Sequence, residues 1–261
     1  MTAAASEPGE VTAVDINADA GESFGVWRMG SDEALFPHLT SVNLAAGFHA
    51  GDPRQMRAAV ALAKQHGVAV GAHPGFPDLV GFGRRDIEAT PDQVYADVLY
   101  QIGALSAFLR AQDMTLHHVK PHGALYNRST RNADTARAIA EAVRDYDRDL
   151  PLVVLAGSMS EDVGRDVGTR VVREAFPDRA YLADGRLAPR SMEGALVRDA
   201  GKAAERAVAM LLEGRVVAHD GQEVPVQAET LCIHGDNAEA TDIARAIGDA
   251  LTAAGVRVAA Y

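Results

Sequence analysis

Residues 13–22 of the chain read AVDINADAGE and predict a β-strand that ends in polar residues and glycine. Its polar side chains Asp15, Asn17 and Asp19 stand two positions apart, with one apolar residue between each pair. Because successive side chains of a β-strand point to opposite faces, a strand here gathers three polar groups on one face. A buried strand that ends in polar residues and glycine is typical of α/β proteins, in which functional groups collect at the carboxyl ends of parallel strands.

Strand-like and helix-like patterns alternate along the rest of the chain. The predicted strands are Ala13–Ala18, Ser41–Ala46, Val68–Ala72, Leu116–Lys120, Leu152–Ala156, Arg170–Arg173 and Thr230–His234. The predicted helices are Pro53–His66, Pro91–Ala111, Asp134–Tyr146, Ser160–Val167, Asp199–Glu213 and Asn237–Ala254. This alternation indicates βαβ units and a parallel sheet, and it fits an open doubly wound sheet as well as a barrel.

Local signals mark several helix ends. Thr90 precedes Pro91 and stands three positions before Gln93, which is the pattern of a capping box. Gly67 ends the preceding helix just before a strand. The chain of 261 residues contains no linker rich in Pro or Ser, so we expect one domain over residues 11–261. Residues 1–10 are small and polar and are predicted to form a disordered tail.

Composition excludes several classes of protein. A formal net charge of −11 argues against a basic face for nucleic acid. No apolar run approaches the roughly 18 residues of a membrane span, and the first residues lack the basic and apolar regions of a secretory signal. The single cysteine, Cys232, cannot form an internal disulfide and suits a reducing compartment. We therefore expect an acidic cytoplasmic protein that binds neither nucleic acid nor membrane.

Polar residues gather at the ends of five predicted strands. They are Asp15, Asn17, Asp19 and Glu22 at the first strand, Asn43, His49 and Asp52 at the second, His73 at the third, His118, Lys120 and His122 at the fourth, and His234 and Asp236 at the last. Burying so many groups without partners would cost about 1–3 kcal/mol each. A shared polar cleft, and hence a common active site, is the more economical interpretation.

Individual residues also have purely structural interpretations. Asp52 and Asp236 each precede a predicted helix that they can cap. Cys232 can simply be a small apolar side chain in the core, and Tyr126 and Asn127 can form a turn after the fourth strand. A lone histidine at a strand end is more often a hydrogen-bonded structural residue than a ligand.

Two irregular segments border this set. The loop Pro74–Arg85 is rich in Gly and Pro, and its Arg84 and Arg85 can clamp a carboxylate or phosphate, although solvated surface arginines fit as well. Residues 174–190 offer structural salt bridges as readily as functional groups. The chain has no phosphate-binding loop, no dinucleotide fingerprint and no nucleophile elbow, and Cys232 lacks the signature of a catalytic thiol.

Four motifs in this order resemble the LamB/YcsF family. They are residues 15–25, residues 47–53, residues 71–75 with 81–85, and residues 118–127. The resemblance runs from about Val14 to the C-terminus, and one departure is Ala46, where many relatives have cysteine. It implies a distorted seven-stranded (β/α) barrel, TIM-barrel-like and of the glycoside hydrolase/deacetylase type. It therefore favours the barrel over the open sheet.

The resemblance also implies a function. The family provides the A subunit of a 5-oxoprolinase, which opens the 5-oxoproline lactam to L-glutamate while ATP is hydrolysed to ADP and phosphate, together with partner subunits B and C. Two alternatives stay open: a metal-dependent deacetylase or hydrolase of the same barrel superfamily, and a non-catalytic subunit that delivers substrate. Association into a homo-oligomer also stays open.

Residue roles follow as hypotheses from the chemistry of the side chains. The candidate catalytic residues are Asp19, Glu22, His49, His73, Lys120 and His122. The candidates for binding substrate or ATP are Asn17, Asn43, Arg84, Arg85, Tyr126, His234 and Asp236. Asp19, Glu22 and Asp52 are the candidates for Mg²⁺, whereas in the metal-dependent alternative Asp19 binds the ion with His49, His73 or His122.

Overall fold

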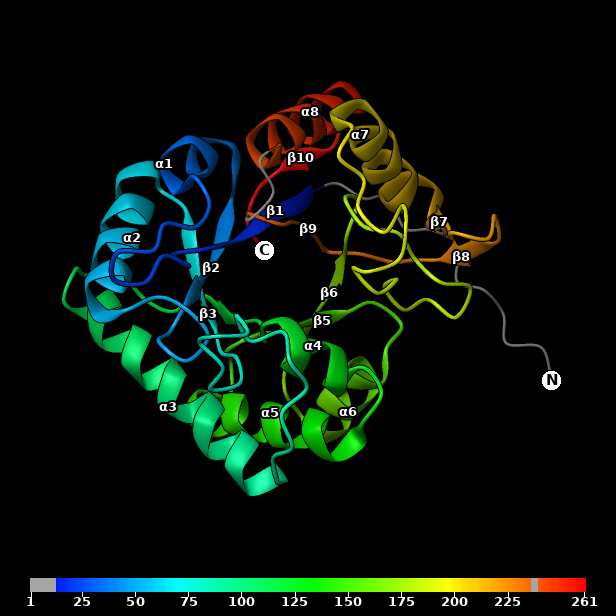
Figure 1. The fold of residues 1–261 in the computed structure, drawn as a ribbon. Helices are drawn as coiled ribbons and strands as arrows, with labels where there is room; N and C mark the ends of the chain where they lie inside the picture. Colours follow the sequence, from blue (N-terminus) through cyan, green and yellow to red (C-terminus); the bar gives the residue numbers. More distant parts are fainter. Residues whose placement is uncertain (1–12, 236–238) are drawn as a thin grey trace.

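Seven parallel strands close into a barrel in a computed structural model that describes residues 13–235 and 239–261 (Figure 1). In barrel order they are β1 (Ala13–Ala20), β2 (Ser41–Ala45), β3 (Ala69–His73), β4 (His118–Val119), β5 (Leu152–Leu155), β6 (Val171–Ala175) and β9 (Thr230–Ile233). Strand β9 pairs with both β6 and β1, which closes the ring. The prediction of a seven-stranded barrel is confirmed. The expected tail at residues 1–10, the boundary at residue 11 and Asp236 lie outside the described residues.

Helices surround the barrel on its outside (Figure 1). The longer ones are α2 (Pro53–His66), α3 (Pro91–Arg110), α5 (Ala133–Tyr146), α6 (Met159–Val167), α7 (Ala200–Val208) and α8 (Ala240–Ala253). All six predicted helices are present, but the one expected over residues 199–213 is α-helical only to Val208 and continues as a π-helical turn, Ala209–Glu213. No helix among the described residues is long and apolar enough to cross a membrane.

Several short elements are absent from the sequence prediction. They are α1 (Asp32–Leu35), a 3₁₀ turn (Phe36–His38), α4 (Gly123–Ser129), the antiparallel hairpin of β7 (Arg215–Val217) and β8 (Glu223–Pro225), and β10 (Arg257–Val258), which pairs with the start of β1. Each is too short to show a clear period of hydrophobicity. Helix α4 matters most, because it replaces the turn expected at Tyr126 and directs that side chain into the barrel.

The predicted helix signals are confirmed by hydrogen bonds. Thr90 and Gln93 form the reciprocal capping box of α3. Asp52 caps α2 by accepting from the backbone amides of Arg54 and Gln55, at 2.8 and 3.3 Å. Gly67 ends α2 with a φ of 67°, the left-handed conformation that glycine adopts readily.

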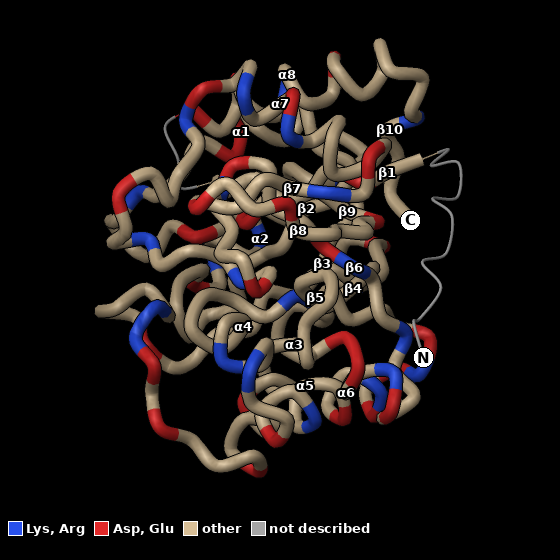
Figure 2. The backbone as a smooth tube through the Cα atoms, turned by 90° about the vertical axis from the view of Figure 1, so that its right-hand side faces the viewer, with Lys and Arg blue, Asp and Glu red and all other residues tan. Residues whose placement is uncertain are grey.

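The barrel strands are buried on both faces, as expected where helices cover a parallel sheet. The outward face of β1 is apolar, and Ile16 lies against Gly248 of α8. Charged residues lie mostly on helices and loops (Figure 2). Asp15, Asp19 and Glu174 are charged residues on barrel strands whose carboxylates contact interior groups from other strands. The interior of the barrel is therefore polar and needs internal partners.

A glycine makes room for one of these interior groups. In the register of the sheet, Gly71 of β3 stands between Asn43 of β2 and His118 of β4. Because Gly71 has no side chain, the His118 ring reaches across it, and its Nε2 lies 2.7 Å from Asn43 Oδ1.

We predict that Gly71→Ala lowers the free energy of unfolding by about 1–3 kcal/mol, because the new Cβ would overlap the buried His118 ring. Urea denaturation measures the change. The matched control is Gly103→Ala on α3, where a Cβ meets no heavy atom within 4 Å, and we expect it to stabilise the protein by up to about 1 kcal/mol. A Gly71→Ala variant as stable as the wild type would contradict this packing.

Candidate active site

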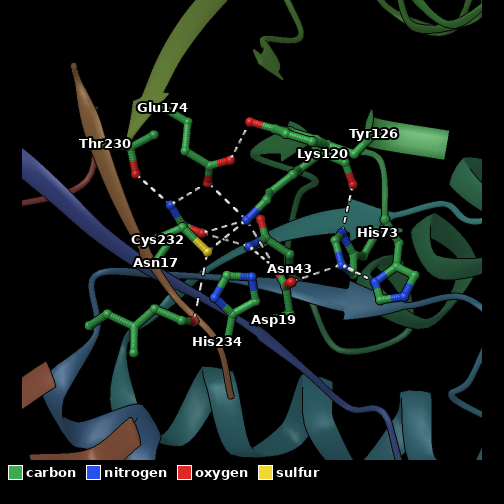
Figure 3. Close-up of polar contacts among 12 residues, drawn as sticks. Asn17, Asp19, Asn43, His73, Lys120, Tyr126, Glu174, Thr230, Cys232 and His234 are labelled. Atoms are coloured by element: carbon green, nitrogen blue, oxygen red, sulfur yellow. Dashed lines mark hydrogen bonds and ion pairs between the residues drawn. The ribbon is translucent and has the colours of Figure 1, made fainter. Parts of the chain in front are cut away.

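The ammonium of Lys120 lies at the centre of the barrel interior (Figure 3). Although β4 ends at Val119, the Lys120 amide still donates to Ala72 O of β3 at 2.9 Å, so the side chain keeps its inward direction. Lys120 Nζ lies 2.8 Å from Glu174 Oε1 and 3.1 Å from Asp19 Oδ1. Burial by itself lowers the pKa of Lys120, but its neighbours, Asp19 first and then Cys232 and Glu174, raise it well above its usual value. The group is therefore a buried, permanently charged cation.

Cys232 and two amides complete this environment. Lys120 Nζ donates to Cys232 Sγ at 2.9 Å, and burial raises the pKa of that thiol well above its usual value. Asn17 Oδ1 lies 3.3 Å from Lys120 Nζ and also accepts from Asn43 Nδ2 at 2.7 Å. The Asn17 amide group donates to Glu174 Oε1 at 3.0 Å. These contacts fix both amides, so Asn17 and Asn43 hold the charged groups in place from within the barrel.

Glu174 is a site residue that the sequence did not single out. Its side chain is fully buried on β6, where Oε1 contacts Lys120 and Oε2 accepts from the Tyr126 hydroxyl at 3.0 Å. Burial, followed by the Glu174 charge, raises the pKa of Tyr126 well above its usual value, so the hydroxyl keeps its proton. Val172 and Glu174 are two positions apart in β6, so they lie on the same face of the strand. This spacing is a sequence signal that Glu174 shares the face of a buried residue.

Asp19 belongs to two groups of residues at once. Its Oδ1 contacts Lys120 and accepts from Asn43 Nδ2 at 3.0 Å, while its Oδ2 lies 3.3 Å from His73 Nε2 (Figure 3). Burial by itself raises the pKa of Asp19, but His73 and Lys120 outweigh it and hold the pKa well below its usual value. Asp19 is therefore an ionised carboxylate at the mouth of the barrel interior.

Three predicted histidines and Glu22 form a second cluster beside Asp19. One potential ligand atom each from Glu22, His49, His73 and His122 lies within 4.8 Å of the others, and all four residues are buried. His49 Nε2 is 3.3 Å from Glu22 Oε1, and His122 Nδ1 is 2.9 Å from His73 Nε2. The structure therefore brings together four residues that the sequence placed at the ends of different strands.

His234 lies on the side of Asp19 away from His73 (Figure 3), and the carboxylate of Asp178 holds its ring. Its Nδ1 lies 2.8 Å from Asp178 Oδ2, which also accepts from the His234 backbone amide at 3.0 Å. Since a carboxylate only accepts, Nδ1 is the donor in this contact. The ring stacks on Phe176 at 5.5 Å between centroids. Asp178 was missed because it lies in an irregular segment without a periodic pattern.

A cavity of about 520 Å³ opens above these groups. Asp19, Lys120, His122, Tyr126 and His234 contribute to its lining, together with apolar residues such as Phe176. The arginines that border it are Arg84, Arg131, Arg179, Arg186 and Arg190. The cavity therefore offers a buried ammonium at its base and several guanidinium groups at its walls, which suits a small anionic ligand.

Two predicted site residues have structural roles in the loops. Arg85 forms a hydrogen-bonded ion pair with the buried carboxylate of Asp78, whereas the neighbouring Arg84 borders the cavity. Besides capping α2, Asp52 accepts from the Gly25 amide at 2.7 Å, so both of its oxygens are used by backbone groups. The structural interpretation of Asp52 is thus confirmed, and its use as a Mg²⁺ ligand gains no support.

The described residues do not form an oxygen-lined Mg²⁺ site. Of the three candidates, Glu22 lies among imidazoles, Asp19 contacts an ammonium, and Asp52 binds backbone amides. Mg²⁺ prefers oxygen ligands and retained waters, so this donor set does not fit it. The arrangement can instead stabilise negative charge through Lys120 and the arginines, and it can move protons through His234.

Comparisons with known proteins identify the family and the fold of the chain. The sequence pattern of the LamB/YcsF family matches residues 14–261. The A subunit of the 5-oxoprolinase of Thermus thermophilus is 62% identical over 248 residues, which cover 95% of this chain and 99% of that protein. The crystal structure of a lactam utilization protein from Thermus thermophilus covers 95% of this chain and all of that one, with 60% identity and a TM-score of 0.90. The catalytic domain of a peptidoglycan N-acetylglucosamine deacetylase from Eubacterium rectale shares the fold, with 11% identity, a TM-score of 0.51 and coverage of 100% and 92%.

We predict that His118 makes the protein less stable in mild acid. Burial, followed by the charges of His117 and Lys120, lowers its pKa well below the ordinary value of 6.5. Below pH 6.5 the unfolded state therefore binds a proton that the native state does not, so stability falls as the pH drops, by up to about 1.4 kcal/mol per pH unit for one group. His118→Gln should reduce this slope in urea denaturation between pH 7 and pH 5, whereas His66→Gln, which changes an exposed histidine, should leave it unchanged. Equal slopes for both variants would contradict the assignment.

Proposed function

The chain belongs to the LamB/YcsF family, and on that premise we propose that it is the A subunit of an ATP-dependent 5-oxoprolinase. Such an enzyme opens the 5-oxoproline lactam to L-glutamate and hydrolyses ATP to ADP and phosphate. Relatives that carry the name of this 5-oxoprolinase component, at 62% identity over nearly the whole chain, support the proposal. The observation that carries it is the buried Lys120 ammonium at the base of an arginine-bordered cavity, because both the substrate and the reaction are anionic.

The chemistry explains why ATP is consumed. A five-membered lactam resists water because its amide carbon is a weak electrophile and its nitrogen a poor leaving group. Phosphorylation of the amide oxygen activates that carbon. One water then adds to it, the ring C–N bond breaks as the nitrogen takes a proton, and a second water releases phosphate from the acyl phosphate. This sequence demands charge stabilisation and placement more than covalent catalysis.

The residues of the site can perform these tasks. Lys120, held charged by Asp19 and Glu174, stabilises the negative charge of the phosphorylated amide oxygen. His234, oriented by Asp178, accepts a proton from the water and returns it to the leaving nitrogen. Arg84 and the other cavity arginines bind the substrate carboxylate or the phosphate.

Partner subunits B and C are part of the proposal. The sequence contains no phosphate-binding loop, so we assign the ATP site, and with it the Mg²⁺ that accompanies the nucleotide, wholly or partly to a partner. The free, buried thiol of Cys232 is consistent with the reducing cytoplasm that we propose as the location. A delivery role without catalytic residues is the alternative, and the variants below separate the two.

We predict that Lys120→Ala and Asp19→Asn each lower 5-oxoproline-dependent ATP hydrolysis by about 10²–10³-fold in the assembly reconstituted with subunits B and C. Lys120→Ala removes the cation that balances the charges of Glu174 and Asp19, which costs about 3–5 kcal/mol, so folding must be checked by circular dichroism. Asp19→Asn keeps the shape of the side chain and therefore tests the charge alone.

The matched control is Arg245→Gln, which removes an exposed ion pair on α8, and it should keep full activity. If folded Lys120→Ala and Asp19→Asn variants keep full activity with several small lactams as substrates, the catalytic assignment is wrong and the delivery role is supported.

We predict a contrast between two adjacent arginines. Arg84→Gln should raise the KM for 5-oxoproline at least tenfold, because Arg84 borders the cavity. Arg85→Gln should act mainly on the stability of the loop, because Arg85 binds Asp78. Steady-state kinetics and thermal melting of both variants measure the contrast. A larger KM effect from Arg85→Gln would reverse the assignment.

A further inference from the structure

The buried imidazoles of His73 and His122 face each other through two nitrogens that both lack a proton when the rings are neutral. His73 Nδ1 lies 2.7 Å from Lys120 O, and His122 Nε2 lies 2.8 Å from Phe82 O. Since a carbonyl oxygen only accepts, both of these nitrogens carry protons. In the neutral rings the other nitrogens, His73 Nε2 and His122 Nδ1, are then bare acceptors 2.9 Å apart. Either a proton or a metal ion must lie beside this pair to offset the repulsion of the lone pairs.

Two carboxylates approach the same point, and Asp19 Oδ2 lies 3.3 Å from His73 Nε2. Glu22 Oε1 lies 3.6 Å from His122 Nδ1 and 3.3 Å from His49 Nε2. The His49 ring stacks on the His122 ring at 3.8 Å between centroids and 2° between planes. An ion in the plane of His122 therefore lies out of the plane of His49, so His49 is placed to hold the Glu22 carboxylate rather than to bind the ion.

Backbone carbonyls orient two of these histidines. The outer N–H groups of His73 and His122 bind backbone carbonyls, which is the contact that orients metal-ligating histidines in proteins.

The loop Pro74–Arg85 is shaped to close over this cluster. A Cβ on Gly83 would lie 2.7 Å from both His122 Cδ2 and His49 Cβ, and one on Gly75 would lie 2.7 Å from His49 Nδ1. Both positions therefore need glycine for the backbone to approach the rings. The positive φ of Phe82, 54°, accompanies the turn that presents its carbonyl to His122.

We propose that Glu22, His73 and His122 bind one divalent transition-metal ion, with Zn²⁺ as the best match, and that His49 orients the Glu22 carboxylate. Two imidazoles and a carboxylate are typical zinc ligands, unlike the oxygen ligands of Mg²⁺. Two nitrogens bound at about 2.1 Å in the tetrahedral geometry of Zn²⁺ lie roughly 3.4 Å apart, so binding would move His73 Nε2 and His122 Nδ1 about 0.5 Å further apart than their present 2.9 Å.

The position of the cluster suggests what the ion would serve. His122 and Asp19 both line the cavity, and Asp19 links the cluster to Lys120. An ion here would bind a water or a substrate oxygen next to the ammonium. This role rests on the proposed function, whereas metal binding itself does not.

The test uses the full-length protein after treatment with a chelator and dialysis. We expect calorimetric titration with ZnCl₂ to give one bound ion per chain, and CoCl₂ to give visible absorption bands from nitrogen and oxygen ligands. Glu22→Gln, His73→Ala and His122→Gln should each weaken Zn²⁺ binding at least about tenfold. His66→Ala, which removes an exposed histidine from α2, is the control and should bind Zn²⁺ like the wild type.

The outcomes separate this inference from the proposed function. A folded wild type that binds neither Zn²⁺ nor Co²⁺ would show that a proton occupies the position and would overturn the metal site. Unchanged affinity in all three ligand variants, with circular dichroism showing native folds, would overturn it too. A reconstituted 5-oxoprolinase that is fully active with no transition-metal ion on this chain refutes the role of the ion in the reaction and supports the proposed function. One bound ion in a chain without lactam-dependent activity supports the metal site and refutes the proposed function.

Discussion

A charged lysine enclosed in a protein interior must find all its partners within the fold, and the barrel is arranged around this requirement. Lys120 Nζ lies within 3.3 Å of groups on β1, β6 and β9, contributed by Asn17, Asp19, Glu174 and Cys232. A buried ammonium without such partners would lose its charge or destabilise the fold by several kcal/mol. Asn17 also binds Glu174, and Asn43 joins Asn17 to Asp19, so these groups behave as one network, and removing a member leaves others unsatisfied.

Asp19 joins this network to the histidine cluster. One of its oxygens contacts the Lys120 ammonium and the other faces His73. A single carboxylate therefore interacts with a charged lysine and with a histidine that can become charged. A change in protonation or occupancy on the imidazole side must therefore alter the electrostatic environment of Lys120. The cavity opens where the two groups meet, which places an incoming substrate in contact with both.

The sequence predicts most of the barrel, because strand and helix periods are local properties. It also predicts that polar strand ends share a site, and His49, His73 and His122 do meet. It misses Glu174 and Asp178, because their importance arises from partners 54 or more positions away along the chain, Lys120 and His234. It does not reveal the contacts of Arg85 and Asp52 for a related reason: residue type and position near a strand end cannot show that a side chain binds Asp78 or a helix terminus.

The closure of the barrel by β9 against β1 affects the order in which the protein folds during its synthesis. Asn17 donates to Thr230 across 213 positions of sequence, and Lys120 reaches Cys232 across 112. Loops of this size close slowly, and contacts of such long range form late in folding. A chain still emerging from the ribosome therefore contains Asp15, Asn17 and Asp19 for most of its synthesis without the strand that completes their surroundings. The centre of the molecule, where its chemistry lies, is assembled only after nearly all of the chain has been made.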